Sequence, residues 1–478
     1  MAEIIGREQE RRELLERYNS GRSEFIAVYG RRRVGKTFLI RETLAGKITF
    51  QHTGLNAYEG EKPTTTADQL RHFHHQLISY GAEEAQAPTD WMEAFYMLER
   101  LLQKLDNGER QVVFIDELPW LDTHGSGFLT AFEAFWNGWA DGRNIMLVVC
   151  GSAASWIIKN LVMNTRGLYG RLTWEIKLAP FTIRETELML QHQGVNMNRY
   201  DIAQLYMALG GIPYYLGYVQ RNLSLSQNID KIFFARNSRL RLEFDRLFKS
   251  QFKHYDDLEQ IVRFLSTKRC GYTRTEIAKA LGRSEGGAFS GKLRTLEESD
   301  FITSYRPFDA RKYETLYRLS DPFCRFYLAF VDRQKPSPSF WTDNQMSQRI
   351  AAWRGIAFED LCMLHIHQIK KALECAAVAS EQSSWTLRND ENHDGAQMDL
   401  IISRADNVVN LCEMKFYSTE ISISKEEDRK MRNRIALLME NILRRQSVQP
   451  VLITTFGLKE GMYSSSFVRT VTLDDLFL

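Results

Sequence analysis

The sequence has no marked excess of charge of either sign. Its 62 lysines and arginines nearly balance 60 aspartates and glutamates, which leaves a formal net charge of +2. The overall charge therefore gives no argument for a nucleic-acid partner, and a contact with DNA or RNA has to come from local basic patches. Because 44% of the 478 residues are hydrophobic and 12% are aromatic, the chain has ample material for packed cores, which excludes a disordered protein.

Cysteine, proline and long apolar runs are also scarce. The six cysteines are scattered and none forms a CxxC pair, which argues against a thiolate metal site, a thioredoxin-like redox pair and a disulfide framework. The longest apolar runs, such as IMLVVC, fall far short of the roughly 20 residues that a membrane span needs. The N-terminus, MAEIIGREQE, is charged from its third residue and does not fit a signal peptide. We therefore expect a cytoplasmic protein with no membrane contact.

The pattern of strands and helices changes along the chain. Continuous apolar strands that begin near Phe25, Gln111 and Asn144 alternate with helical patterns, and this alternation is typical of a parallel sheet covered by helices on both faces. After about residue 180 only helical patterns continue. From about residue 258 to residue 320, helical stretches precede two short strands with a basic tip, which is the order of a winged helix-turn-helix. The stretch DRQKPSPSF, with two of the ten prolines, is the clearest linker.

A phosphate-binding loop is the clearest motif. The stretch GRRRVGKT fits the pattern GxxxxGK[ST], with an apolar strand before it and a helix after it. Such a loop closes its backbone N–H groups around phosphates at the N-terminus of the helix. Lys36 is expected to reach the β- and γ-phosphates of ATP, and Thr37 to give its hydroxyl oxygen to Mg²⁺. The nucleotide-binding residues predicted here are Gly30, Arg31, Arg32, Arg33, Val34, Gly35, Lys36 and Thr37.

A second motif, VVFIDE, ends in Asp116 and Glu117. An aspartate at the carboxyl end of a strand beside the loop suits Mg²⁺, and the neighbouring glutamate suits the polarisation of an attacking water, so the pair indicates hydrolysis and not mere binding. The alternative is an acidic helix cap that follows a strand. The glycines that a dinucleotide-binding GxGxxG motif requires are missing, which excludes a Rossmann-type site.

Further stretches extend this pattern over about the first half of the chain: FWNGWA, VVCGSAASW and GLYGRLTWEIKLAPF. With the two motifs they resemble the archaeal-type, AAA+-related P-loop ATPases of the STAND-like and origin-recognition-like kinds, in a bacterial member. The resemblance implies ATP binding and hydrolysis. It also implies that Ser152 senses the γ-phosphate and that Pro213, in GGIPYYL, lies near the base of the nucleotide. The alternative for Pro213 is a proline at a helix start.

The same resemblance makes Arg166 and Arg171, in TRGLYGR, candidates for an arginine finger, a guanidinium that neutralises charge in the transition state. Arg171 fits the family pattern better, and we take it as the catalytic candidate. A pair of surface arginines is the alternative. Because a neighbouring subunit can supply the finger, a homo-oligomer stays open, although a second sensor arginine of the usual AAA+ kind is not identifiable.

The predicted winged helix offers basic side chains to a nucleic acid. Lys292 and Arg294 lie on its second helix, and Arg306, Arg311 and Lys312 lie at the tip of the wing. Such residues suit contacts with phosphates, whereas base readout would need side chains that reach into a groove. A solvated face, or a surface for another domain, explains them equally well.

The stretch QMDLIISRADNVVNLCEMKFYS, residues 397–418, predicts two apolar strands joined by a turn. Since side chains alternate between the faces of a strand, Glu413 and Lys415 share one face, and Asp399 opens the preceding strand. Two carboxylates and a lysine would then meet near one strand end. Carboxylates suit Mg²⁺, and a lysine beside them suits phosphodiester hydrolysis, because it orients the nucleophile or neutralises the developing anion.

This D…ExK pattern resembles the PD-(D/E)xK nuclease superfamily, with Met398 in place of the proline. The superfamily commonly adds a glutamate from an upstream helix, and Glu359 in RGIAFEDLCMLHI matches that position. The resemblance thus implies the metal ligands Glu359, Asp399 and Glu413, and the catalytic residues Asp399, Glu413 and Lys415. An exposed Glu–Lys pair on an edge strand is the alternative.

Together these observations predict an α/β protein with several parts. They are a P-loop ATPase core with a parallel sheet at 1–180, a helical lid at 181–255, a winged helix-turn-helix at 256–331, a linker at 332–344 and an α/β restriction-endonuclease-like domain at 345–478. We expect an ATP- and Mg²⁺-dependent ATPase that acts on nucleic acid, DNA in the first place, with a Mg²⁺-dependent nuclease in its C-terminal part, in genome defence, mobile-element or repair work. The alternative is a STAND-like switch driven by ATP, whose C-terminal domain is an inactive binding module.

Overall fold

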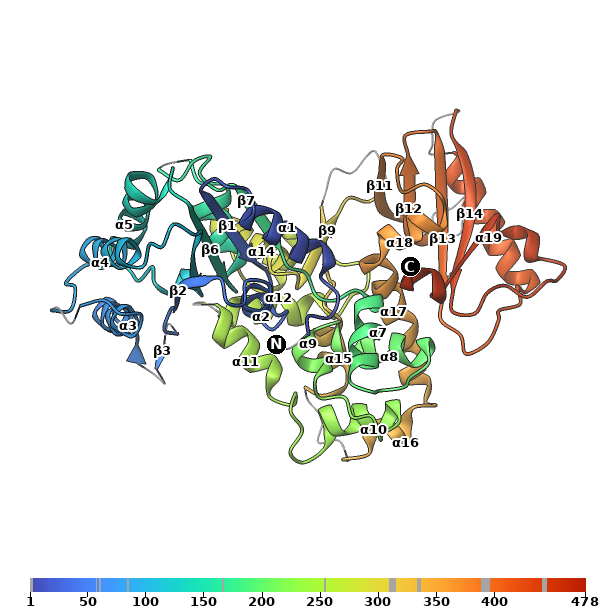
Figure 1. Ribbon diagram of the computed structural model, residues 1–478. Coiled ribbons are helices and arrows are strands. Elements are labelled where there is room, and N and C mark those ends of the chain that lie inside the picture. Colours follow the sequence, from blue (N-terminus) through green and yellow to red (C-terminus); the bar gives the residue numbers. More distant parts are fainter. Residues whose placement is uncertain are drawn as a thin grey trace. The chain divides into compact units, whose positions relative to one another are not determined.

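The structure of the protein is a computed structural model (Figure 1). It describes residues 3–56, 58–59, 62–83, 86–165, 167–252, 255–308, 315–332, 337–387, 396–440 and 445–478. The chain divides into two compact units, Met1–Ala179 and Pro180–Leu478. Of the helices within the described residues, none combines the length and the apolar character that a membrane crossing requires.

A parallel sheet of five strands, in the order β2–β5–β6–β1–β7, forms the centre of the first unit. The strands are β1 (Glu24–Tyr29), β2 (Ile48–Thr53), β5 (Gln111–Asp116), β6 (Ile145–Gly151) and β7 (Trp174–Lys177). All residues of β1, β5 and β6 are buried, because these strands lie in the interior of a sheet that is covered on both faces. The parallel α/β arrangement predicted for this part of the chain is confirmed.

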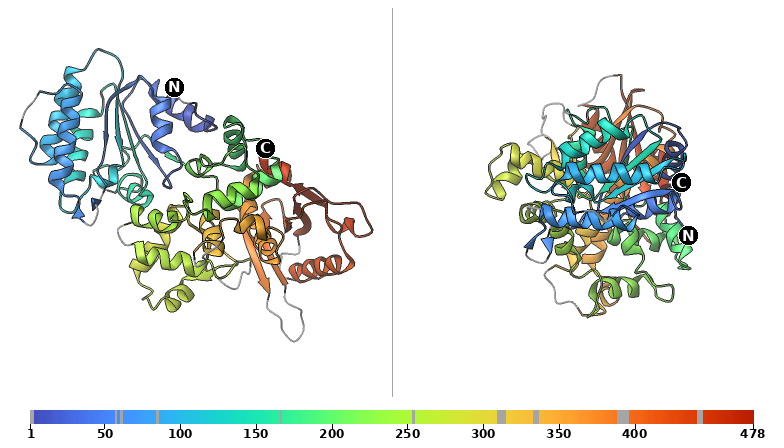
Figure 2. Two further views of the ribbon diagram at one scale, coloured as in Figure 1. Left: turned by 90° about the horizontal axis from the view of Figure 1, so that it is seen from below. Right: turned by 60° about the vertical axis from the view of Figure 1, so that its left-hand side comes forward.

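Helices lie on both faces of this sheet (Figure 2). They are α1 (Glu8–Tyr18), α2 (Lys36–Thr43), α3 (Thr66–Ser79), α4 (Trp91–Lys104), α5 (Phe128–Phe135) and α6 (Ala154–Ile157), and a short hairpin of β3 (Tyr58–Glu59) and β4 (Lys62–Pro63) precedes α3. On one face the core is rich in aromatic rings. Phe25 of β1, for example, packs edge-on against Phe132 of α5 with ring centroids 5.6 Å apart. This packing fixes the carboxyl ends of the strands, where the predicted nucleotide site lies.

The second unit begins with helices. They are α7 (Ile183–His192), α8 (Arg199–Leu209), α9 (Pro213–Leu216), α10 (Leu225–Ile229) and α11 (Glu243–Gln251). A buried histidine joins α7 to a later part of the unit: Nε2 of His365 accepts a hydrogen bond from the backbone N–H of Ile183 (2.8 Å). Burial lowers the pKa of His365 to about 4, which keeps the ring neutral and able to accept this bond at neutral pH.

A small antiparallel sheet with the order β8–β10–β9 follows. Its strands are β8 (Tyr272–Thr273), β9 (Ile302–Tyr305) and β10 (Leu316–Leu319), and it is accompanied by α12 (Tyr255–Leu265), α13 (Arg274–Ala280) and α14 (Gly287–Glu298). We call residues 255–319 the small-sheet segment. The turn between α12 and β8 requires Gly271, whose φ is +75°, because a Cβ atom there would lie 2.2 Å from the carbonyl oxygen of Tyr317.

The last part of the chain forms a mixed sheet with the order β11–β12–β13–β14–β15. Its strands are β11 (Ser380–Leu387), β12 (Ala396–Arg404), β13 (Val408–Lys415), β14 (Ser447–Thr454) and β15 (Arg469–Thr472). The hairpin predicted from the sequence is present: β12 and β13 pair antiparallel with Leu400 opposite Cys412, and β14 and β15 continue the sheet in parallel. Asn407, in the turn of this hairpin, has a φ of +67°, which asparagine tolerates better than most residues.

Helices flank this mixed sheet. α15 (Pro322–Phe330), α16 (Phe340–Asn344), α17 (Gln348–Leu364) and α18 (Ile366–Ala372) precede it in the chain, and α19 (Lys425–Met439) connects β13 to β14. Met431 and Leu438 of α19 share a core with Trp385 of β11 and Ile401 of β12. On the other side, α17 lies against β13, which brings Glu359 of this helix to the hairpin.

Candidate functional site

The loop Gly30–Thr37 connects β1 to α2 at the carboxyl end of the parallel sheet. Gly30 has a φ of +141°, and a Cβ atom on it would lie 2.3 Å from the carbonyl oxygen of Leu178. Gly35 has a φ of +94° and directly precedes α2. A residue with a Cβ atom would be strained at both of these backbone conformations. The conformation of the loop therefore explains why the motif has glycine at these two positions.

The side chain of Lys36 turns back onto this loop. Its Nζ atom donates hydrogen bonds to the carbonyl oxygens of Gly30 (3.0 Å) and Arg31 (2.9 Å). Burial lowers the pKa of Lys36, and the carboxylates of Glu117 and Asp116 oppose that effect. The ammonium group thus has neutral oxygen partners, which the charged oxygens of a phosphate can replace with a gain in bond strength.

Asp116, at the end of β5, has hydrogen bonds on both carboxylate oxygens. Thr37 Oγ1 donates to Oδ2 (3.0 Å), which ties the start of α2 to β5. The thiol of Cys150 donates to Oδ1 (2.7 Å), and so does the backbone N–H of Glu117 (3.0 Å). Burial, followed by the charges of Asp116 and Glu117, raises the pKa of the Cys150 thiol, so this thiol is protonated at neutral pH. Thr37 and Asp116 together offer the oxygen donors that Mg²⁺ prefers.

Glu117 lies beside the end of β6. Its Oε2 atom accepts hydrogen bonds from the backbone N–H (3.0 Å) and the hydroxyl group (3.1 Å) of Ser152. The backbone of Glu117 has a φ of +48°, a strained conformation that occurs often at functional sites. Gly151 permits the close approach of the two strand ends, since a Cβ atom there would lie 2.6 Å from the ring of Pro119. The structure therefore brings together the predicted residues Lys36, Thr37, Asp116, Glu117 and Ser152.

Other residues predicted for the nucleotide site have different surroundings. Arg171 forms a half-exposed ion pair with Asp141 (3.0 Å). Arg166, the second candidate for an arginine finger, lies outside the described residues. Pro213 is the first residue of α9, where a proline fits a helix start, and it belongs to the second unit.

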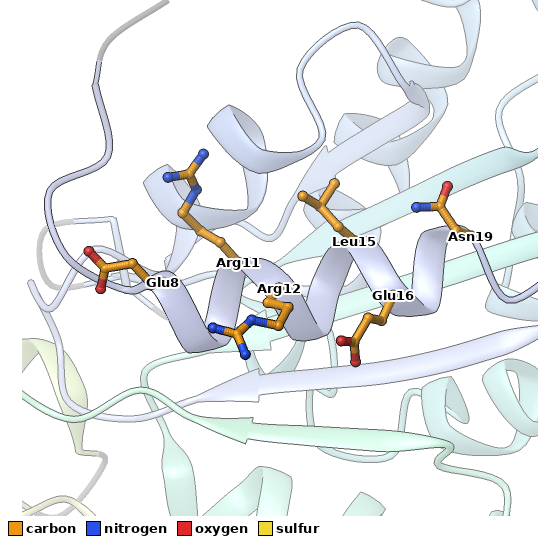
Figure 3. A pocket seen from close by; sticks show the side chains of 6 residues that line it. All are labelled: Glu8, Arg11, Arg12, Leu15, Glu16 and Asn19. Atoms are coloured by element: carbon orange, nitrogen blue, oxygen red, sulfur yellow. The ribbon is translucent and has the colours of Figure 1, made fainter.

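An open depression in the first unit lies along α1 and not at the P-loop (Figure 3). The residues that line it come from α1 and from the residue after it: Glu8, Arg11, Arg12, Leu15, Glu16 and Asn19. Because a single helix supplies every side chain, polar groups do not converge on one point as they do in a ligand pocket. The depression is a gap between neighbouring side chains on a helix surface.

In the second unit, Glu359 of α17 and Asp399 of β12 share one cation. Arg269, from the turn between α12 and β8, contacts both: its Nε atom lies 2.5 Å from Oε2 of Glu359, and its Nη2 atom contacts Oδ2 of Asp399. Burial, followed by the charge of Asp399, raises the pKa of Glu359 to about 9, and Arg269 opposes this shift. The guanidinium group therefore joins the carboxyl groups of two neighbouring acids, of which Glu359 is mostly protonated at neutral pH.

The other two predicted residues of this region, Glu413 and Lys415, lie on the same face of β13. Nζ of Lys415 lies 3.0 Å from Oε1 of Glu413, and Arg434 of α19 donates to Oε2 of Glu413 (2.8 Å). Burial alone would lower the pKa of Lys415, but Glu413 outweighs that effect and the pKa lies above its usual value. Lys415 is therefore an ammonium ion at neutral pH.

The predicted acids thus contact cations of the protein itself. Within the part of the chain that the structure describes, no group of three or more histidine, cysteine, aspartate or glutamate side chains gathers closely enough to hold a metal ion. Glu359 and Asp399 contact Arg269, and Glu413 contacts Lys415 and Arg434. Two separate charge groups, and not one acidic centre, occupy this end of the hairpin.

Sequence reasoning did not find two of the residues in these sites. Cys150 precedes Ser152 by two positions in VVCGSAASW, so the alternation of side chains along a strand could have indicated it as a neighbour of the acids. Arg269 follows no local pattern, because its carboxylate partners lie far along the chain in α17 and β12.

Comparison with known families addresses the first half of the chain. Residues 4–219 match the model of an ATPase domain that occurs predominantly in Archaea. The chain contains an archaeal-type ATPase domain. This match and the closed P-loop geometry around Lys36 make the protein an ATP-hydrolysing enzyme and a nucleotide binder.

Individual proteins from archaea also resemble this chain. An uncharacterised protein of Methanocaldococcus jannaschii is 26% identical over 330 residues, which are 69% of this chain and 69% of that protein. The Walker-type ATPase of Pyrococcus abyssi is 17% identical, with 68% of this chain and 96% of that chain covered and a TM-score of 0.46. The ORC2 protein of Aeropyrum pernix, solved in ADPNP–ADP complexes, is 14% identical, with 69% and 94% covered and a TM-score of 0.42. Both solved structures are remote, and the family match is what identifies the ATPase domain.

Cys150→Ala is expected to lower kcat of the ATPase domain by about 10- to 100-fold, the range for lost partners of metal-binding side chains. The variant removes the thiol donor to Asp116 but no group that contacts the nucleotide, so KM for ATP should change little. Cys150→Ser keeps a donor and should recover part of the activity. Steady-state hydrolysis with saturating Mg²⁺ measures both constants, and unchanged turnover in Cys150→Ala would contradict a role for the thiol.

Proposed function

We propose that this ATPase acts on DNA and that its second unit hydrolyses phosphodiester bonds with Mg²⁺. The geometry of the β12–β13 hairpin carries the proposal. Leu400 and Cys412 are opposite each other and buried. Beside this pair lie the predicted acids of each strand. Asp399 of β12 shares Arg269 with Glu359 of α17, and Glu413 of β13 lies 3.0 Å from Lys415.

The residues at this end of the hairpin suit metal-assisted hydrolysis. Mg²⁺ takes carboxylate oxygens and water. Glu359 and Asp399, which meet at Arg269, would hold it, and Glu413 would join them after it leaves Lys415 and Arg434. When bound, the metal lowers the pKa of a coordinated water and stabilises charge on the phosphoryl group. Lys415, whose pKa is raised, acts as a cation and not as a general base: it orients the nucleophile or neutralises the anion that develops on the phosphate.

In the ATPase domain, the proposal gives separate roles to the residues around the P-loop. Lys36 binds the β- and γ-phosphates. Thr37 and Asp116, with oxygens 3.0 Å apart, would hold Mg²⁺, which neutralises phosphate charge when bound. Glu117 polarises the attacking water, and Ser152, which donates two hydrogen bonds to Glu117, senses the γ-phosphate.

Further assignments complete the proposal for ATP. Arg171 serves as the arginine finger once it leaves Asp141, and Pro213 lies near the base. The remaining parts are a core at 1–180, a helical lid at 181–255, a winged helix at 256–331, a linker at 332–344 and a nuclease-like domain at 345–478. A finger from a neighbouring copy would require a homo-oligomer.

The proposed winged helix corresponds to the small-sheet segment and would contact DNA phosphates. Its order of helices and its three-stranded antiparallel sheet support this assignment. Lys292 already pairs with Asp257 (2.5 Å), whereas Arg294 and Arg306 have exposed side chains that suit phosphate contacts. The wing-tip residues Arg311 and Lys312 lie outside the described residues.

DNA cleavage by the complete chain tests the proposal. Single- and double-stranded DNA, incubated with Mg²⁺ or Mn²⁺, should be cut, and excess chelator should stop the reaction. Asp399→Asn keeps the size of the side chain but removes its charge, and it should lower cleavage at least about 100-fold. Asp406→Asn, which alters an exposed aspartate paired with Arg404 in the same hairpin, is the matched control. Intact ATP hydrolysis without cleavage of any DNA would contradict the nuclease.

A second candidate function is an ATP-driven switch whose C-terminal part binds a partner without cutting nucleic acid. The observation that favours it is that Glu359, Asp399 and Glu413 all contact cations supplied by the protein. Ion pairs of this kind can be purely structural. The cleavage experiment separates the two functions, because a switch would lose partner binding and not phosphodiester hydrolysis when these acids are neutralised.

A further inference from the structure

The carboxylates of Glu359 and Asp399 are bridged by a residue of the small-sheet segment. Arg269 uses two different nitrogen atoms, one for each acid. We infer that Arg269 is a built-in occupant of the metal site, so that its guanidinium group has to leave both carboxylates before a divalent cation can bind them. This inference rests on the proposed nuclease function and adds the regulation of that same site.

The backbone of the small-sheet segment fixes the turn that presents Arg269. The hydroxyl of Tyr305, in β9, donates to the carbonyl oxygen of Cys270, and the N–H of Gly271 donates to the carbonyl oxygen of Lys268 (3.2 Å). Gly271 itself packs against the backbone of β10, too closely for any side chain. Arg269 is therefore held at this position by its own segment and does not reach the acids by chance from a loose loop.

Further contacts hold the small-sheet segment and α15 against the C-terminal part. Asp360, the residue after Glu359, is buried and contacts Arg325 of α15, with Arg318 of β10 at 3.9 Å. The N–H of Phe308, just after β9, donates to the carbonyl oxygen of Ser384 in β11 (2.8 Å). Two successive acids of α17 thus face arginines of the preceding part of the unit, which sets the position of Arg269 relative to the hairpin.

The contacts made by Arg318 and Arg325 are more deeply buried than the contact made by Arg269. The side chains of Arg318 and Arg325 are each 8% exposed, whereas that of Arg269 is 35% exposed. Arg269 is therefore the most accessible of the three arginines, while the contacts around Asp360 keep the segment in place. The contacts explain why it stays: the oxygens of two neighbouring acids converge on one point, and either the guanidinium group or a metal ion can occupy that point.

Competition of this kind weakens metal binding. The apparent affinity equals the intrinsic affinity multiplied by the fraction of molecules in which Arg269 has left both acids. If Arg269 occupies them in nine molecules of ten, the loss is about tenfold. A ligand that draws the turn between α12 and β8 away from α17 would raise the affinity for metal by the same linkage. DNA bound to the small-sheet segment is the ligand that the proposed function supplies.

Binding of Mn²⁺ to the complete, nucleotide-free chain tests the inference, with free Mn²⁺ measured by its electron paramagnetic resonance signal. Arg269→Gln should bind Mn²⁺ about tenfold more tightly than the unmodified protein. Lys268→Gln is the matched control, because the neighbouring Lys268 pairs with Glu276 and not with the acids of the site, and it should leave the affinity unchanged. Adding Asp399→Asn to Arg269→Gln should remove the gain, which assigns it to this site and not to the P-loop.

Each outcome decides the inference. A tighter site that depends on Asp399 supports it. Equal Mn²⁺ affinity in Arg269→Gln and the unmodified protein, with a site that Asp399→Asn abolishes in both, overturns the role of Arg269 and leaves the proposed nuclease standing. Absence of any Mn²⁺ binding that depends on Asp399 overturns both. Thermal unfolding of every variant shows whether a change in affinity comes from a damaged fold.

Discussion

Lys36→Ala is expected to abolish ATP hydrolysis, with kcat at least about 100-fold lower, the usual loss when a charged group that stabilises the transition state is removed. Lys36 is buried and its ammonium group lies within the P-loop, bonded to the carbonyl oxygens of Gly30 and Arg31. Lys36 is the residue of this motif that reaches the β- and γ-phosphates, so its loss would remove the cation at that point. ATP binding should weaken as well, because the same group contacts the ground state.

Turnover of ATP and binding of a fluorescent ATP analogue measure the two effects of Lys36→Ala. Lys159→Ala is the matched control, because Lys159 is an exposed lysine of the same unit. Loss of the buried side chain also removes two hydrogen bonds within the loop, so unfolding has to be followed in parallel. Normal turnover in a folded Lys36→Ala protein would be incompatible with the assignment of the ATPase site.

Lys415→Ala is expected to lower DNA cleavage at least about 100-fold while the fold remains intact. Its ammonium group lies 3.0 Å from Glu413, the predicted metal ligand on the same face of β13. Removal of the lysine takes away the cation that faces the phosphate, but Glu413 keeps its second partner, Arg434 (2.8 Å). The acid is therefore not left without a counter-ion, and stability should change little.

The matched control for Lys415 is Lys430→Ala. Lys430 forms a comparable ion pair with Glu426 (2.8 Å), but this pair is exposed on α19. Exposed pairs contribute about 0–1 kcal/mol to stability, so Lys430→Ala should stay folded. Because Lys430 pairs with Glu426 and not with an acid of the proposed site, this variant should cut DNA at the unmodified rate. If both lysine variants lose cleavage alike, the effect of Lys415 would be one of surface charge and not of the site.

Much of the fold follows from local sequence patterns. The continuous apolar runs gave β1, β5 and β6, because interior strands of a covered sheet need apolar residues on both faces. The edge strand β2, ITFQHT, was not predicted. It lies beside β5 at the edge of the sheet, where Thr49, Gln51 and Thr53 are half-buried although His52 is buried. Edge strands carry a weaker signal than interior strands, since one side of their backbone faces no neighbour.

The candidate sites were predictable only where neighbours in sequence are neighbours in space. The P-loop motif gave Lys36 and Thr37, and strand alternation gave the contact between Glu413 and Lys415. The contacts of Cys150 with Asp116 and of Arg269 with the acids of the second unit join distant parts of the chain. Such pairs depend on how whole elements pack. Alternation along β6 indicates the face that Cys150 takes, but no local period in the sequence indicates Arg269.

We propose that one chain holds two separable sites for phosphate chemistry. The most direct test measures ATP hydrolysis and DNA cleavage by Lys415→Ala in the same Mg²⁺-containing reaction, beside the unmodified protein. Cleavage should be lost in this variant while ATP is hydrolysed at the unmodified rate. Cleavage at the unmodified rate in Lys415→Ala would contradict it.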